Sequence, residues 1–219
     1  YNGSRQNLRR INMNLFACHT DPVKAAQALP DKHVVKMCIE NAQMLAVALG
    51  ELHGMGWGQI RKKDGTFYSQ KAHYNHPSTV WVRSSYANLA WTIVHGLALC
   101  AEYTHRYGKI HASVIAHLDA RDLFHKHAEL PLSIWTSVES FARAMPEEIK
   151  FDESITDVDA YRKYLTLHKP WAVWKIETRK PTWWNPSFYE ECQSPSTENH
   201  TKSMVSSSIQ NFTTASKKP

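Results

Sequence analysis

Three segments of the chain combine amine, carboxylate and imidazole groups at spacings that could do chemistry. In the first, His33, Lys36 and Glu40 are spaced i, i+3 and i+7, so on a helix they share one face. A lysine beside a carboxylate is the smallest set that amine chemistry needs, because the amine attacks and the acid moves protons. Asp31 and Lys32 open the same segment and offer a second acid and a second amine. The alternative is an exposed face with an ordinary Lys36–Glu40 ion pair.

The second segment is Asn75-His76-Pro77, which Trp81 and Arg83 follow. Asn75 could pair with an adenine edge, and His76 could transfer protons. Trp81 near Arg83 suits a base that stacks close to a phosphate. The alternatives are a helix cap at Asn75–Pro77 and a core tryptophan beside a solvated arginine.

The third segment places Glu102, Arg106 and Lys109 at i, i+4 and i+7, on one side of a helix near its end. The two cations could bind phosphate. Cations are also favoured there by the helix dipole, whatever the function. Later in the chain, cations and aromatic residues alternate from Lys169 to Trp184, as in a surface that grips a nucleic-acid strand. The alternative, which we favour for Trp171 and Trp174, is that these tryptophans pack against the helices.

No metal and no cofactor is predicted. His73-x-x-His76 and His125-x-His127 lack a third ligand at a recognised spacing, and the chain has no phosphate-cradling glycine loop. The cysteines form no Cys-x-x-Cys pair, which predicts free thiols in a reducing, intracellular setting: Cys18, Cys38, Cys100 and Cys192.

Composition limits the class of protein. The 219 residues, 42% of them hydrophobic, are enough for one domain with a real core. The formal charge of +6 favours an anionic partner, nucleic acid before membrane. No apolar run reaches the roughly 18 residues that a membrane span needs.

The periodicity is helical and predicts a mainly α fold, a compact single-domain helical bundle. The domain is expected at residues 13–186, after a disordered or artefactual extension at 1–12 and before a disordered polar tail at 187–219. A small hairpin is expected around Asp64-Gly65. The predicted helices are 22–29, 31–49, one from Pro77, 86–107, 112–127, 133–144 and 157–168. In the helix at 31–49 the i, i+3, i+4 rule predicts this buried face: Val35, Cys38, Ile39, Ala42, Leu45, Ala46 and Leu49.

Taken together, the motifs are similar to those of the pyrimidine-dimer DNA glycosylases of the phage endonuclease V type. The resemblance spans roughly 13–185 and is strongest at about 31–45 and 75–109. The motifs that carry it are Asp31-Lys32-His33-Val34-Val35-Lys36, Asn75-His76-Pro77-x-x-x-Trp81, Leu97-x-Leu99-Cys100-x-Glu102-Tyr103-x-x-Arg106-Tyr107-Gly108 and Arg179-Lys180-Pro181-Thr182-Trp183-Trp184.

The resemblance implies a helical fold that kinks DNA, flips a base and cleaves the glycosidic bond through an imine. In that family the nucleophile is the α-amine that removal of the first Met exposes, and a glutamate on the first long helix assists it. This chain departs from the pattern twice. Asn14 follows Met13 and is larger than the residues before which Met is normally removed. The glutamate's place falls near Lys32 or His33, where no carboxylate stands.

We therefore expect a protein from a phage or bacterium that acts in the cytoplasm on damaged or modified duplex DNA, as a base-damage glycosylase with AP-lyase-type imine chemistry. The expected amine is Lys36 or Lys32, and the expected acid is Glu40 or Asp31. His33 and His76 would move protons, and the nucleic-acid contacts would be Lys32, Asn75, Trp81, Arg83, Arg106 and Lys109. Two alternatives stay open: a non-catalytic DNA-binding phage accessory protein, and an enzyme or binder of a small nucleotide.

Overall fold

The computed structural model describes residues 13–51 and 56–185. The predicted extension at 1–12 and the predicted tail at 187–219 lie outside the described residues. The helices all belong to one compact unit, which ends at Trp184.

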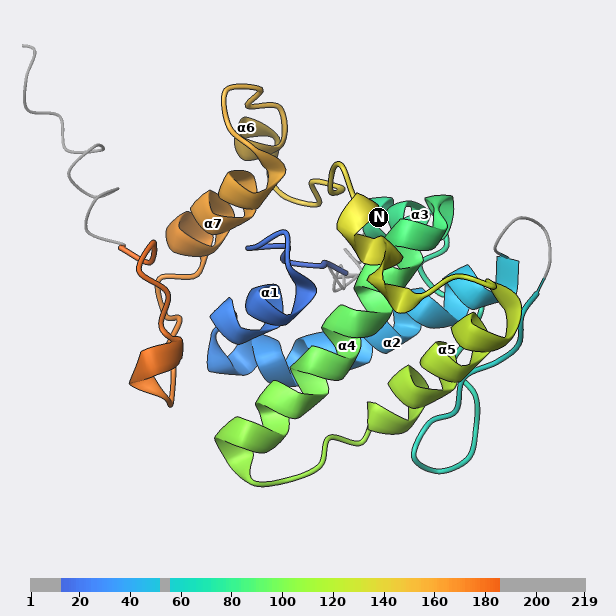
Figure 1. Cartoon of the computed structure of the whole chain (residues 1–219). Helices are drawn as coiled ribbons and strands as arrows, with labels where there is room; N and C mark the ends of the chain where they lie inside the picture. The colour runs from blue at the N-terminus through green and yellow to red at the C-terminus, as the bar shows by residue number, and fades with distance from the viewer. Residues whose placement is uncertain (1–12, 52–55, 186–219) are drawn as a thin grey trace, which may run out of the picture. The chain divides into compact units, whose positions relative to one another are not determined.

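The prediction of a mainly α fold is confirmed (Figure 1). Among the described residues the only extended pairing is one antiparallel bridge between Arg61 and Phe67, so the predicted hairpin around Asp64-Gly65 is confirmed as a minimal one. None of the described helices is long and apolar enough to cross a membrane. In chain order the helices are α1 (Pro22–Ala28), α2 (Asp31–Glu51), α3 (Pro77–Ser84), α4 (Tyr86–Tyr107), α5 (Val114–His127), the 3-10 helix η2 (Leu132–Ser137), α6 (Glu147–Lys150), α7 (Asp157–His168) and the 3-10 helix η3 (Glu177–Arg179).

Capping residues explain why most helices begin and end where the sequence predicts. The Asp21 side chain accepts hydrogen bonds from the backbone N–H groups of Val23 and Lys24, with Pro22 in the first helical position. Ser85 caps α4 in the same way, and Gly108 closes α4 in the left-handed conformation at φ 66°.

The predicted helix at 133–144 is wrong beyond its first turns, because η2 ends at Ser137 and extended backbone follows. The polar backbone groups of this stretch bond to side chains from other elements instead of to each other. The Ser140 carbonyl accepts from Trp81 Nε1 at 2.7 Å, and the Phe141 N–H donates to Asp157 at 2.7 Å. The Ala144 carbonyl accepts from Asn14 Nδ2 at 2.7 Å. Distant partners therefore overrode the local helical pattern.

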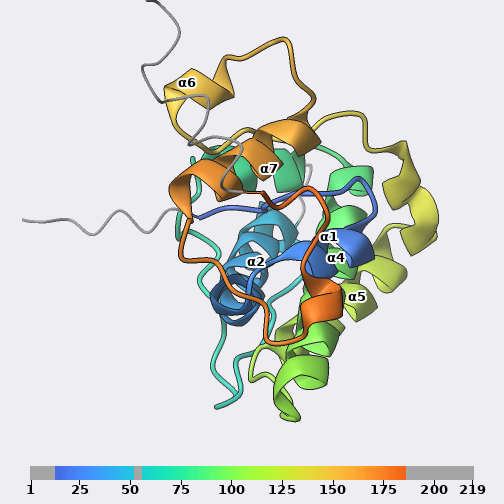
Figure 2. The same ribbon diagram turned by 90° about the vertical axis from the view of Figure 1, so that its left-hand side faces the viewer.

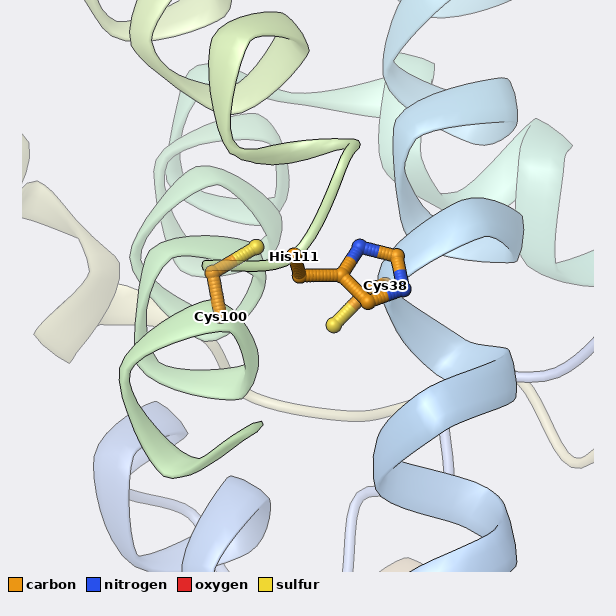
Figure 3. A group of neighbouring side chains, drawn as sticks. All are labelled: Cys38, Cys100 and His111. Atoms are coloured by element: carbon orange, nitrogen blue, oxygen red, sulfur yellow. The ribbon is translucent and has the colours of Figure 1, made fainter. Parts of the chain in front are cut away.

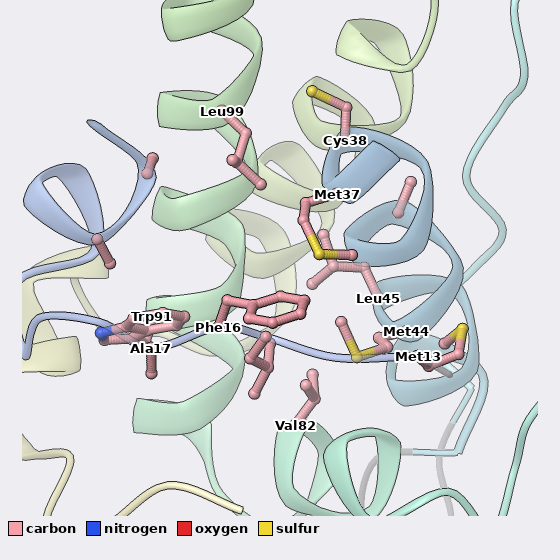
Figure 4. Close-up of a cluster of buried hydrophobic side chains, with 14 of the residues drawn as sticks. Met13, Phe16, Ala17, Met37, Cys38, Met44, Leu45, Val82, Trp91 and Leu99 are labelled. Atoms are coloured by element: carbon pink, nitrogen blue, oxygen red, sulfur yellow. The ribbon is translucent and has the colours of Figure 1, made fainter. Parts of the chain in front are cut away.

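The core forms around α4, which packs against α1, α2, α3, α5 and η2. Trp91 of α4 is fully buried, and Phe16 of the N-terminal segment lies between α4 and α2 (Figure 4). The predicted buried face of α2 is wrong at two positions, since Val35 is 37% and Ile39 51% exposed. In their place the polar residues His33 and Glu40 are buried. Such buried polar groups point to a site rather than to packing.

The segment after α7 runs along the junction of α1 and α2 (Figure 2). The Asp31 N–H donates to the Val173 carbonyl at 2.9 Å, and Trp174 Nε1 donates to the Ala28 carbonyl at 3.1 Å. Trp174 is buried, as expected, whereas Trp171 is 45% exposed. The C-terminal part of the unit thus reaches the first turn of α2, where His33 lies.

Candidate active site around Glu40

Glu40 of α2 is a buried carboxylate that lies between two nitrogen atoms. Its Oε1 is 2.8 Å from Lys36 Nζ, one helical turn earlier, and its Oε2 accepts a hydrogen bond from the Asn14 backbone N at 3.3 Å. Glu40 is 5% exposed, whereas the Lys36 side chain is 58% exposed. Burial raises the pKa of Glu40, while Lys36 and the Asn14 N–H act in the opposite direction. The spacing therefore predicted the Lys36–Glu40 pair, and the fold adds burial and Asn14.

Asn14 is fixed by its own side chain. Its Oδ1 accepts from the backbone N–H groups of Leu15 at 2.8 Å and Phe16 at 3.2 Å, which forms a tight turn. Phe16 has φ 48°, in the left-handed region that few residues other than glycine adopt. Asn14 Nδ2 donates to the Ala144 carbonyl. The backbone nitrogen of Asn14 is thus held toward Glu40 from two sides.

An open pocket of about 330 Å³ adjoins this arrangement. Its wall includes Met13 and Ala144, which are the chain neighbour of Asn14 and the hydrogen-bond partner of its side chain. The other lining residues are His76, Pro77, Arg143, Met145, Pro146, Lys150 and Tyr164. The pocket is large enough for a small ligand and has cationic groups in its wall.

His33 supports the site as a neutral ring. It lies edge-on to Phe16, with ring centroids 4.6 Å apart, and stacks on Trp171 at 5.6 Å. Burial, with help from the positive charges of Lys169 and Lys36, lowers the pKa of His33 to about 4. The ring is therefore uncharged near neutral pH and cannot act there as a general acid.

Two lysines each lie over an aromatic ring on the exposed side of the site. Lys32 Nζ lies 4.8 Å from the centre of the Trp171 ring, and Lys169 Nζ lies 5.4 Å from the centre of the Tyr164 ring. Burial and the neighbouring charge of Lys36 lower the pKa of Lys169. We call Lys32, Lys36, Lys169 and Trp171 the basic surface.

The residues of the second sequence segment lie at and near α3. His76 caps α3 through Nδ1, which accepts from the Ser78 N–H at 3.2 Å, and it also lines the pocket. Burial and the charge of His73 lower the pKa of His76. Asn75 is exposed. Trp81 is buried against Trp91 and Phe141, and the Arg83 guanidinium lies over the Tyr74 ring.

The structure separates Asp31 and Arg106 from Glu40. Asp31 and Glu40 are nine positions apart on α2, which is about 14 Å along the helix. Arg106 is buried, and its guanidinium bonds to Asp31 at 2.9 Å and Glu102 at 2.8 Å, as well as to two backbone carbonyls. Lys109 is exposed just beyond this end of α4. Asp31, Glu102 and Arg106 thus form a structural junction, whereas Lys109 stays a predicted nucleic-acid contact.

Residues 13–116 match the family model of the pyrimidine dimer DNA glycosylases. This segment belongs to the pyrimidine dimer DNA glycosylase superfamily. Comparison with curated proteins and with solved structures finds no match for the chain. The superfamily match supports a DNA-binding role of the glycosylase kind in general.

The glycosylase segment contains Asn14, Lys36, Glu40 and His76, whereas Ala144, Tyr164 and Trp171 lie beyond it. The sequence has no carboxylate at position 32 or 33, yet the fold brings Glu40 to the Asn14 nitrogen. Sequence reasoning missed Asn14 and Tyr164 as site residues, whereas the alternation of cations and aromatic residues had already pointed to Lys169. The position of Asn14 after Met13, in the family resemblance, was a signal for Asn14.

Proposed function

We propose that the chain is a DNA glycosylase with AP-lyase activity on a damaged or modified base, in which Lys36 is the amine and Glu40 the proton-transfer group. The observation that carries this proposal is the buried Glu40 carboxylate, 2.8 Å from an exposed amine and hydrogen-bonded to the Asn14 N–H, whose chain neighbour Met13 lines a pocket. A surface ion pair would need no buried acid, because exposed pairs contribute little to stability.

In the proposed reaction Glu40 first accepts a proton from the Lys36 ammonium, which frees the amine. The raised pKa of Glu40 makes its carboxylate a stronger base than an exposed one. Lys36 Nζ then attacks C1′ of the deoxyribose, and the glycosidic electron pair leaves with the base, which takes the proton that Glu40 accepted. The C1′–O4′ bond opens, O4′ takes up a proton from the attacking nitrogen, and a protonated imine forms. Glu40, deprotonated again, removes a C2′ proton, and the C3′–O bond breaks with its electrons on the phosphate.

The basic surface is the proposed DNA contact. Lys32, Lys36 and Lys169 can neutralise phosphates, and the exposed part of Trp171 can contact a sugar or a base. Flipping a nucleotide toward the pocket costs a few kcal/mol, and less for a damaged base. This difference would give selectivity without extensive base readout.

Borohydride trapping tests the proposal. The protein is incubated with duplex DNA that carries a thymine dimer or an abasic site, and borohydride reduces any imine to a stable adduct. We expect an adduct in the wild type and in Lys63→Arg, a control on the hairpin. We expect none in Lys36→Arg, which keeps the charge but does not supply the amine. Glu40→Gln should slow adduct formation about 100-fold, as loss of a general base does.

Two results would contradict the proposal in different ways. An adduct in Lys36→Arg that peptide mapping places on the Asn14 nitrogen would mean that cleavage before Asn14 creates the amine, because Asn14 is also beside Glu40. Salt-sensitive DNA binding with no adduct on either substrate would leave the non-catalytic DNA-binding alternative.

A further inference from the structure

A second cluster of reactive side chains lies on the other side of α2 from Glu40. Cys38 precedes Glu40 by two residues, which is about 200° around a helix. Its thiol approaches Cys100 of α4 and His111 of the loop before α5 (Figure 3). The three ligand atoms all lie within 4.8 Å of one another. All three residues are buried, with at most 7% of the residue exposed.

We propose that Cys38, Cys100, His111 and His117 bind a zinc-type divalent metal ion that links α2, α4 and the start of α5. Two thiolates and two imidazoles are a ligand set that zinc prefers in structural sites, and one that magnesium and calcium do not take. In a tetrahedral zinc site two sulfur ligands lie about 3.8 Å apart. The ligand atoms of Cys38, Cys100 and His111 therefore need to move by only about 1 Å, whereas His117 lies outside this 4.8 Å group and has to move further to complete the site.

His117 is the independent observation that points to a metal. It is fully buried, and its Nε2 donates to the Cys38 carbonyl, with 3.0 Å between the two atoms. This bond leaves the lone pair on Nδ1, which has no hydrogen-bond partner with good geometry among the described residues. The ring also lies against the Cys100 thiol. A histidine whose second nitrogen donates to a carbonyl is the usual arrangement of a metal ligand.

Gly96 leaves room for this ring. A Cβ at position 96 would lie 2.3 Å from His117 Nδ1, so any side chain there would displace the imidazole. Gly96 precedes Cys100 by one turn of α4, on the same face. The absence of a side chain at Gly96 thus lets His117 lie next to the Cys100 thiol.

His111 is the adjustable ligand and the point of entry. Its Nδ1 accepts from the Ser113 N–H at 3.1 Å, and the Val35 carbonyl interacts with the same ring. Binding through Nδ1 exchanges the Ser113 hydrogen bond for a metal bond and leaves Nε2–H to the Val35 carbonyl. An open pocket of about 310 Å³, lined by His111, Ser113 and Tyr68 among others, leads to this ring.

Cobalt substitution tests the site on the full chain. The reduced protein is freed of metal with a chelator and titrated with Co²⁺. We expect about one Co²⁺ per chain, with a thiolate-to-cobalt charge-transfer band and the visible bands of tetrahedral cobalt, all of which disappear on addition of Zn²⁺. Cys100→Ser should weaken binding on the order of 100-fold or more and remove the charge-transfer band. Cys18→Ser, which changes another buried cysteine, should leave both unchanged.

Several results would overturn the proposal. The wild-type protein could show no charge-transfer band, or the band could persist in Cys100→Ser. A third such result is that Cys38 and Cys100 form a disulfide and the protein, once reduced, takes up no cobalt. If Cys100→Ser does not fold, His111→Gln decides, because its ring lies at the pocket and its removal should weaken cobalt binding and shift the visible bands. Unchanged binding in His111→Gln would remove His111 from the ligand set and contradict the site as proposed.

Discussion

At the scale of single residues, the burial of Glu40 predicts how the stability of the fold depends on pH. Burial raises the pKa of Glu40, so the folded chain keeps this proton to higher pH than the unfolded chain does. The stability that the proton provides is complete below the unfolded pKa of about 4.3 and is lost as the pH rises through the folded pKa. The burial of Glu40 therefore makes the fold less stable at neutral pH.

We expect Glu40→Gln to remove this pH-dependent destabilisation, because glutamine does not titrate. The melting temperature of the variant should exceed that of the wild type increasingly between about pH 4 and pH 8, with a gain of about 1 kcal/mol at the upper end. The absence of the ion pair with the exposed Lys36 offsets only a small part of the gain. Exposed Glu139→Gln is the control, and a pH-independent difference for Glu40→Gln would contradict the expectation.

Residue spacing predicted part of this site. The Lys36–Glu40 pair follows from one helical turn, so the sequence contains it. The burial of Glu40 does not follow, because it depends on Asn14 and on the Ala144 carbonyl that holds the Asn14 side chain. For the same reason the cluster of Cys38, Cys100 and His117 forms no sequence motif. Its members meet only because α2, α4 and α5 pack together.

At the scale of elements, Arg106 joins three helices at one point. Its guanidinium bonds to the Gln27 and Leu29 carbonyls at the end of α1 and to Asp31 at the start of α2, while Glu102 pairs with it along α4. Truncation would remove the Arg106 charge from both carboxylates, and although Glu102 would keep Arg179 and Asp31 the Lys175 N–H, loss of a buried charge partner is among the most costly single changes.

We expect Arg106→Met to lower the free energy of unfolding by about 3–5 kcal/mol, measured by urea denaturation. Arg121→Met on α5, whose ion pair with Asp122 is exposed, should change it by no more than about 0.5 kcal/mol. A decrease of less than about 1 kcal/mol in Arg106→Met would show that the guanidinium is dispensable and would return Arg106 to the candidates for phosphate contact.

Helix boundaries were predictable where a local cap sets them, as at Asp21, Ser85 and Gly108. The predicted helix at 133–144 failed because Trp81, Asn14 and Asp157 bond its backbone groups from afar. Val35 and Ile39 were misplaced because periodicity alone cannot tell that the polar face of α2 turns inward toward the N-terminal segment. Local chemistry predicts where elements begin, and long-range partners decide what they bury.

At the scale of the whole molecule, the net charge of +6 promotes DNA binding only where the cations lie together on one surface. The proposed DNA contact predicts that Lys32→Gln and Lys169→Gln each reduce the slope of log K against log salt by about 0.9, because each variant neutralises one phosphate fewer. Fluorescence anisotropy of a labelled duplex over a salt series measures this slope. Lys63→Gln, on the hairpin, should leave it unchanged. Equal reductions in all three variants would instead indicate a diffuse attraction without a defined surface.

The bond from Asn14 Nδ2 to the Ala144 carbonyl has a consequence for when the protein can work. It joins positions 130 residues apart, and the same pocket takes further wall residues from Arg143 to Pro146 and from Tyr164. A ribosome adds about 5–20 residues per second, so the far wall is made roughly 7 to 30 seconds after Asn14. Glu40 and Lys36 are by then long synthesised. A growing chain thus contains the proposed catalytic pair well before the far wall of the neighbouring pocket exists.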